Sequence, residues 1–206
     1  MGFFCLLWVP LFYLFWRSIK GQGEFSWGVV ALIAGSVVAM LQFLFGSIIE
    51  PVGFELSRWM SAFIDIVAMP VIVPLLLYFL LSLNKILDNS TDSVDFAGFA
   101  LLWLIPSGAI RAVSWSVQSD PIQLVLVPLL WTAIAVGVPF LVSFYRYRQI
   151  FVIIPAFLGA LFVPFAATYA YWAFFAQLTL WGYIFLVAAM APMLVTIVFA
   201  FLRGAR

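Results

Sequence analysis

Histidine is absent from this chain of 206 residues, and cysteine occurs once, as Cys5. Without histidine, the chain cannot form a Ser-His catalytic dyad, an HExxH zinc site or a histidine-ligated haem, and it lacks the commonest general acid–base. With a single cysteine, no disulfide can form within the chain. These absences argue against most enzyme classes, and we expect neither a metal nor a cofactor.

Charged residues are also scarce. They make up 8% of the chain, whereas 67% of the residues are hydrophobic, and an ordinary soluble domain is about 25% charged. A chain of this length cannot bury so much apolar surface in a soluble core, so lipid must surround most of it. The net charge of +1 provides no basic surface for nucleic acid. We therefore expect a multi-pass integral membrane protein.

Seven apolar segments predict an all-α bundle of about seven transmembrane helices that forms a single domain, 1–206. A spanning helix needs about 20 apolar residues, and the first segment is short for a span. A re-entrant helix within 151–202 would change the count. The predicted helices are 2–16, 26–49, 61–82, 96–118, 122–145, 150–172 and 178–202.

The distribution of basic residues predicts the orientation, because cytoplasmic loops carry an excess of Lys and Arg. If the N-terminus is outside and the C-terminus is cytoplasmic, Arg58 is the only basic residue at an outer end. Short loops and the lack of a targeting segment suggest the plasma (inner) membrane of a bacterium or archaeon. The inner side then holds Arg17, Lys20, Lys85, Arg146, Arg148, Arg203 and Arg206.

Two predicted helices each carry one ionisable residue within the apolar segment: Asp65 and Arg111. A charge at membrane depth is costly, so it usually has a partner and often marks a functional site. A rise of about 1.5 Å per residue places Asp65 roughly 6 Å and Arg111 roughly 10 Å below the outer ends of their helices. Gln42 lies at a similar depth, roughly 10 Å below its own helix end. We predict an ion pair between Asp65 and Arg111 in a tight antiparallel hairpin, with Gln42 as a third member.

Further polar residues extend this group into a predicted vestibule that opens outward. If one side of the Arg111 guanidinium group is free, it can donate hydrogen bonds to a carboxylate or a phosphate. This predicts a small anionic ligand. Two interpretations stay open: a ligand site, or an ion pair that only neutralises itself and sets the register of the hairpin. The predicted site residues are Arg111, Asp65, Gln42, Trp115, Ser107, Ser114, Glu55 and Arg58.

Six of the seven predicted helices contain proline. An interior proline leaves the carbonyl four residues earlier without its usual donor and tends to kink the helix. Pro70 would in this way free the carbonyl of Ile66, next to Asp65. Such carbonyls can bind a cation or a substrate, although bent packing alone also explains many membrane prolines.

Three classes of function remain open. The first is a small transport protein, or the membrane subunit of a transporter with partner subunits, which the vestibule and the kinked helices favour. The second is a structural or assembly subunit of a larger membrane complex, which the small residues of segment 26–49 favour. The third is a lipid-modifying enzyme that uses Asp65, Glu50 or Glu55, and the lack of histidine weighs against it.

Overall fold

Helices account for almost all of the described residues. We describe the chain from a computed structural model. No residue in the described part belongs to a strand, which confirms the predicted all-helical fold class. The described residues are 2–20, 28–49, 58–82, 92–115, 121–144 and 149–204.

Within the described residues, the helical elements join into seven helices, in agreement with the predicted number. Three of the elements, α3, η2 and α4, follow one another without a break and form one helix. The elements are α1 (Gly2–Lys20), α2 (Gly28–Ile49), α3 (Arg58–Phe63), η2 (Ile64–Ile72), α4 (Val73–Ser82), α5 (Asp92–Trp115), α6 (Pro121–Ser143), α7 (Ile150–Phe175) and α8 (Thr179–Gly204).

Two helix boundaries differ from the predicted ones for a common electrostatic reason. Helix α5 begins at Asp92 rather than at 96, and acidic residues near a helix N-terminus are favourable because of the helix dipole. Helix α1 continues to Lys20 rather than ending at 16, and basic residues near a C-terminus are favourable for the same reason. With 19 residues, α1 is about 28 Å long.

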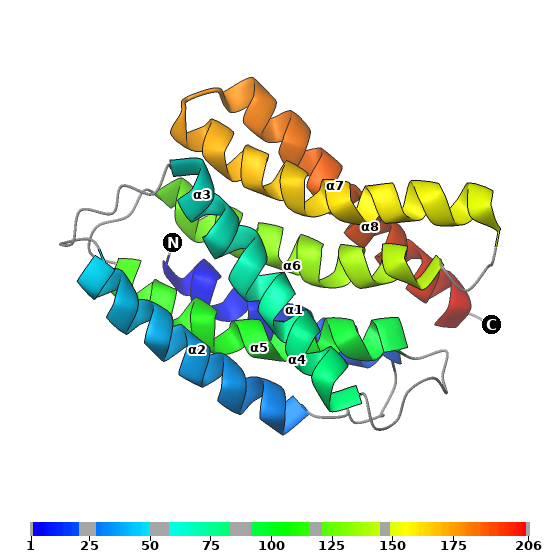
Figure 1. Cartoon of the computed structure of the whole chain (residues 1–206), viewed down its shortest axis with the longest axis horizontal. Helices are drawn as coiled ribbons and strands as arrows, with labels where there is room; N and C mark the ends of the chain where they lie inside the picture. The colour runs from blue at the N-terminus through cyan, green and yellow to red at the C-terminus, as the bar shows by residue number, and fades with distance from the viewer. Residues whose placement is uncertain are drawn as a thin grey trace.

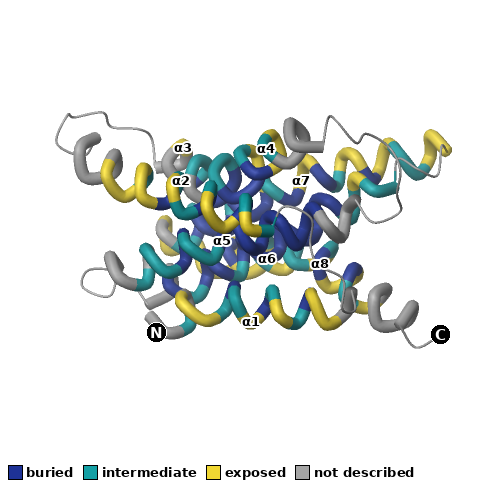
Figure 2. Tube along the Cα trace, turned by 90° about the horizontal axis from the view of Figure 1, so that it is seen from below, coloured by how far each residue is buried: buried dark blue, intermediate teal, exposed yellow. Residues whose placement is uncertain are grey.

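Helices α5 and α6 form the centre of the bundle. Helix α5 contacts α1, α2, α4 and α6, and α6 contacts α1, α7, α8 and η2. The helices lie roughly along one axis and alternate in direction along the chain, so that α2, α5 and α7 run from right to left (Figure 1). The buried residues concentrate in the middle of the bundle (Figure 2), where Trp131 of α6 is 2% exposed.

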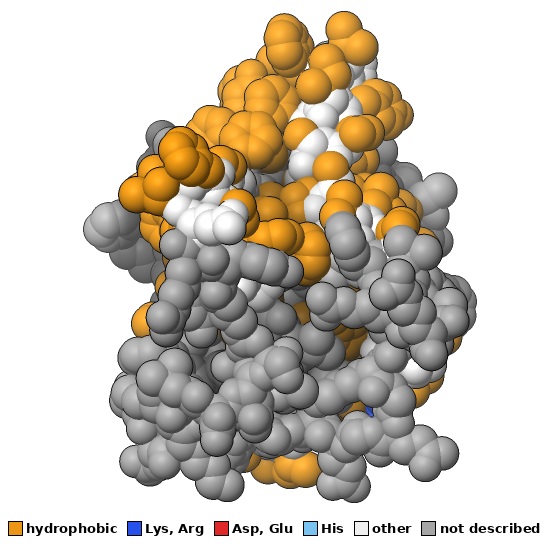
Figure 3. Space-filling view, turned by 90° about the vertical axis from the view of Figure 1, so that its right-hand side faces the viewer, with side chains coloured by type: hydrophobic (Ala, Val, Ile, Leu, Met, Phe, Trp, Pro, Cys, Tyr) orange, Lys and Arg blue, Asp and Glu red, His pale blue; other side chains and the backbone are white. Residues whose placement is uncertain are grey.

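Three helices in the described part are long and apolar enough to cross a membrane. The first, Leu124–Ser143, is 72% buried within the protein, whereas Ile150–Phe174 and Thr179–Val198 are each only 22% buried. The described side chains at the top of Figure 3, where α7 and α8 lie, are hydrophobic. The central α6 therefore packs against other helices, while α7 and α8 expose apolar side chains.

The middle of the third helix is a π-helix of nine residues, Ile64–Ile72, which contains Pro70. At its end, the backbone N–H of Val73 donates to the carbonyl of Ala68, five residues earlier. With this five-residue spacing, the carbonyl that would accept a hydrogen bond from residue 70 is that of Asp65 and not that of Ile66. Because proline has no N–H, the Asp65 carbonyl receives no hydrogen bond from residue 70. The prediction of a regular α-helix that frees the Ile66 carbonyl was therefore wrong.

Candidate functional site

The structure describes the side chains of two of the eight predicted site residues, Gln42 and Ser107. The contact between Asp65 and Arg111 therefore stays a prediction. The side chains that lie outside the described part are those of Asp65, Arg111, Trp115, Ser114, Glu55 and Arg58.

The backbone places the key positions toward one end of the bundle. Helix α3 begins at the end where α2 and α5 finish, at the left of Figure 1. Asp65 is the second residue of η2, close to this end, and Arg111 lies in the last turns of α5, which is described to Trp115. Gln42 is in the second half of α2. The helix directions thus place these three positions toward the same end of the bundle.

Gln42 lies on the face of α2 that packs against α5. This face begins with Ala31, Gly35 and Ala39, which are buried at intervals of four residues. A Cβ atom added to Gly35 would lie 2.5 Å from the carbonyl oxygen of Trp103, so the two backbones are in direct contact there. Helices α2 and α5 run in the same direction. Gln42 and Arg111 therefore lie on the same side of the contact between Gly35 and Trp103, at similar distances along their helices. Gln42 itself is half-buried.

Ser107 is a buried polar side chain in the core. It is 8% exposed and lies on α5, one helical turn before Arg111. Residues four apart share a helix face, so Arg111 continues the face on which Ser107 lies.

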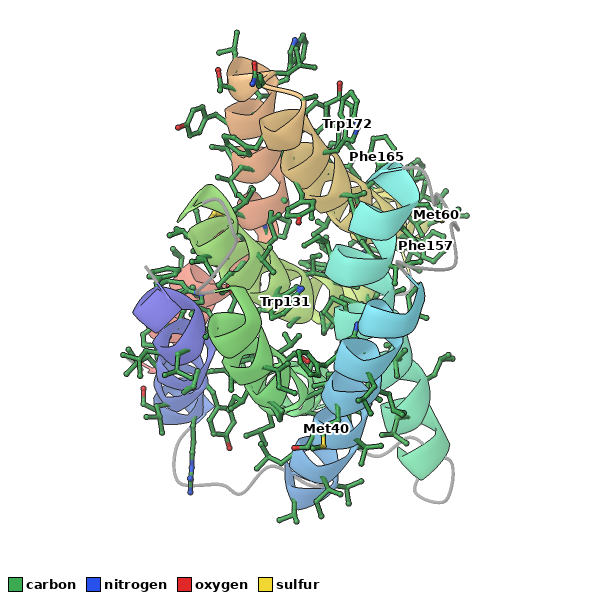
Figure 4. All side chains as sticks on the ribbon, turned by 90° about the vertical axis from the view of Figure 1, so that its left-hand side faces the viewer. Met40, Met60, Trp131, Phe157, Phe165 and Trp172 are labelled. Atoms are coloured by element: carbon green, nitrogen blue, oxygen red, sulfur yellow. The ribbon has the colours of Figure 1, made fainter. Side chains whose placement is uncertain are left out.

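The hairpin formed by the third helix and α5 is close along only part of its length. The α4 part contacts α5, the η2 part contacts α6 and α7 as well as α5, and the α3 part contacts α7. Figure 4 views the bundle from the end at which α3 begins, and α3 lies beside α7 there. The antiparallel packing on α5 that the sequence predicts is therefore present for η2 and α4, while α3 packs against α7 instead.

A recurring Pro-x-x-x-Thr pattern was missed in the sequence. It occurs once in each of α6, α7 and α8, three helices that contact one another. Each threonine is buried, and each hydroxyl donates to the carbonyl of the proline four residues earlier. The spacing could have revealed the motif, because a threonine hydroxyl in a helix often bonds to the i−4 carbonyl. The pairs are Pro128 with Thr132, Pro164 with Thr168, and Pro192 with Thr196.

These hydroxyl groups are already used in intrahelical hydrogen bonds. The distances from threonine Oγ1 to proline oxygen are 3.1 Å for Thr132, 3.0 Å for Thr168 and 2.7 Å for Thr196. A buried hydroxyl that is bonded within its own helix costs little to bury. We therefore assign the three threonines to helix packing rather than to a site.

No metal site is found among the described residues, where no three His, Cys, Asp or Glu side chains come together.

The comparisons with known proteins find no relative: no family model matches the chain, and no curated protein and no solved structure matches it. The function must be argued from the chain's own residues.

Proposed function

We propose that this chain is a multi-pass integral membrane protein of the plasma membrane, a single domain of seven crossings. The three long apolar helices support this proposal, as do the exposed apolar side chains of α7 and α8. Arg17 is exposed near the end of α1, and Arg203 is in the last turn of α8, at the same end of the bundle. A basic end of this kind is typical of the cytoplasmic side. We therefore orient the N-terminus outside and the C-terminus inside.

Within this class, a transport function is the best supported: a small permease, or the membrane subunit of a transporter. The observation that carries this proposal is the π-helix at Ile64–Ile72. Such segments are rare and occur frequently at functional sites, since they interrupt regular backbone bonding. Here the segment contains Asp65, whose carbonyl faces Pro70. Backbone oxygens released in this way, beside an ionisable residue, are typical of transporter binding sites.

The proposed ligand is a small anion that enters from the outer end and binds Arg111. The guanidinium group is planar and can donate two parallel hydrogen bonds to a carboxylate or a phosphate. Gln42 would set the position of the arginine, and Asp65 would lie beside the site without neutralising the arginine. The outer residues Glu55, Arg58, Ser114 and Trp115 would line the entrance, and Ser107 would lie below it.

A screen by thermal stability tests this proposal. The purified protein in detergent is heated with phosphate and with a panel of small carboxylates. At least one anion should raise the melting temperature, because a ligand that binds only the folded state stabilises it. The Arg111→Gln variant should lose this response, and the Arg17→Gln variant should keep it, since Arg17 lies at the opposite end. If no anion stabilises the wild-type protein, the proposed anion site is wrong.

A second candidate is a structural subunit of a membrane complex, and the outer face of α2 favours it. This helix packs on α5 through small residues, and its other side exposes Val29, Ile33, Val37 and Met40. A partner protein that co-purifies in a fixed ratio after mild solubilisation would support this function. A solitary, monodisperse protein that still responds to an anion would support the transport function instead.

A further inference from the structure

The hairpin of α7 and α8 is uncharged over its whole apolar length. Residues 150–202 contain no Asp, Glu, Lys or Arg, and both helices expose large hydrophobic side chains along their outer faces, among them Leu161 and Leu194. Charged residues occur only where the hairpin is open, since Arg148 precedes α7 and Arg203 lies in the last turn of α8. The closed end, at Ala176–Leu178, has none.

The turn that joins the two helices is short, since α7 ends at Phe175 and α8 begins at Thr179. The N–H of Leu178 donates to the carbonyl of Ala173 at 2.9 Å, and the N–H of Gln177 donates to the carbonyl of Phe174 at 3.3 Å. Gln177 has a φ of 59°, so this is a Schellman turn with a left-handed residue after the helix end. The last carbonyls of α7, those of Trp172, Ala173 and Phe174, are thus hydrogen-bonded to N–H groups of the turn.

Aromatic rings collect beside this turn. The ring centre of Tyr169 lies 4.4 Å from that of Phe185 and 5.4 Å from that of Trp172. On the other side, Tyr183 meets the Phe174 ring edge-on at 5.1 Å. Tyr183 is 60% exposed and Trp181 is 52% exposed. Exposed Trp and Tyr side chains are typical of the membrane–water interface, because they have an apolar ring and a polar group.

The position of these rings matches the thickness of a bilayer. The hydrocarbon core is about 30 Å thick, which corresponds to about 20 helical residues. Twenty residues counted back from Arg203 lead to Tyr183, and about twenty counted forward from Ile150 lead to Tyr169. If the charged end lies at the cytoplasmic interface, the aromatic rings lie at the opposite one.

We infer that the closed end of the hairpin lies in the outer interface of the bilayer and binds lipid there through its aromatic rings. The turn at Gln177 reaches the headgroups without projecting into water. Helices α7 and α8 thus form a complete two-helix span whose outer faces contact acyl chains. This inference rests on the proposed membrane location and is independent of the proposed anion site.

Spin labels at four exposed positions measure the depth. In a Cys5→Ser background, single cysteines replace Gln177, Leu180, Leu161 and Leu194, and each nitroxide-labelled protein is reconstituted into phosphatidylcholine–phosphatidylglycerol vesicles. Collision with oxygen, relative to collision with a water-soluble nickel complex, rises with depth. The ratio should be high at Leu161 and Leu194, which are near the predicted midplane, lower at Leu180 and lowest at Gln177. Even at Gln177, the nickel complex should have less access than it has to a label in water.

Each other pattern overturns the inference in a distinct way. A ratio at Gln177 as high as at Leu161 would mean that the hairpin is re-entrant and ends inside the membrane. Full access of the nickel complex to Gln177 would mean that the turn projects into water. Full access at all four positions would contradict the membrane location itself.

Tryptophan fluorescence gives a second measurement without labels. Quenching by lipids brominated at different depths is compared between the wild-type protein and the Trp181→Phe variant, and the difference is the Trp181 signal. Shallow bromines should quench this signal most, and strongest quenching by deep bromines would contradict the inference.

Discussion

The indole N–H of Trp8 donates a hydrogen bond to the hydroxyl oxygen of Thr132, with a nitrogen–oxygen distance of 3.2 Å. The Thr132 hydroxyl lies 3.1 Å and 2.9 Å from the carbonyl oxygens of Pro128 and Leu129, to which it donates in turn. This chain of bonds joins α1 to the central helix α6.

We expect Trp8 and Thr132 to stabilise the fold as a coupled pair. Trp8→Phe and Thr132→Val should each lower the free energy of unfolding, and the double variant should lose less than the sum. A coupling of about 0.6 kcal/mol is the average for hydrogen bonds between membrane helices. Unfolding in mixed micelles measures the four proteins of the cycle. Thr168→Val is the control, because Thr168 bonds to its own helix in the same way and should show no coupling to Trp8. Strict additivity of Trp8 and Thr132 would contradict the prediction.

The crossing of α2 and α5 depends on the absence of a side chain at Gly35. A Cβ atom there would lie 2.5 Å from the Trp103 carbonyl oxygen and 3.0 Å from its Cα, and the Trp103 backbone cannot move alone. Gly35→Ala should therefore force the helices apart and destabilise the protein by about 1–3 kcal/mol. Thermal unfolding in detergent checks the loss.

Gly28 provides the matched control on the same helix. A Cβ atom there would meet only Cδ1 of Leu102, at 3.0 Å, and the end of a leucine side chain can turn away. Gly28→Ala should thus be close to neutral. An equal loss at both glycines would show that the Gly35 contact has no special role.

The turn between α7 and α8 contains a glutamine where glycine is usual. Gln177 adopts a φ of 59°, and the left-handed conformation costs a residue with a Cβ atom about 1–2 kcal/mol. Gln177→Gly should raise the melting temperature, although the greater freedom of glycine in the unfolded chain offsets part of the gain. Ala176→Gly, one residue earlier at a φ of −78°, should lower it. If both variants are destabilised alike, the strain at Gln177 does not limit stability.

The roles of Asp65 and Arg111 can be separated by a double-mutant cycle. If Arg111 is held for an anionic ligand, Arg111→Gln should leave the stability of the ligand-free protein unchanged or raise it, because an uncompensated buried charge is removed. If the two residues form only a structural ion pair, Asp65→Asn and Arg111→Gln should each cost on the order of 3–5 kcal/mol, and the double variant should recover much of the loss. Thermal stability in detergent without added anions distinguishes the two results.

Several features of the fold follow from local sequence. Long apolar segments predict the helices, and their number agrees with the seven helices of the described part. The boundaries at Asp92 and Lys20 were missed, because hydrophobicity alone ignores the favourable effect of charges at helix ends. The π-helix at Ile64–Ile72 was also missed: proline shows that the regular bonding is interrupted, but not how the backbone adjusts around it.

The candidate site was only partly predictable for a similar reason. Helix length and direction place Asp65, Arg111 and Gln42 toward one end, and the structure agrees with this in its backbone. The change of neighbour along the third helix, from α5 to α6 and α7, depends on how all seven helices pack. No pattern within one segment records it.

By itself, the sequence determined that the chain is helical, and it predicted about seven transmembrane helices; seven helices are found in the described part, and three of those are long and apolar enough to span a membrane. Only the tertiary structure decided which helices lie at the centre. Helices α6 and α7 have similar mean hydropathies, 2.3 and 2.5 in their apolar stretches, yet these stretches are 72% and 22% buried within the protein. Lipid tails and a protein interior are both apolar, so hydrophobicity does not distinguish a helix that faces lipid from one that faces other helices. Close contacts such as that of Gly35 with Trp103 contribute to the specific packing.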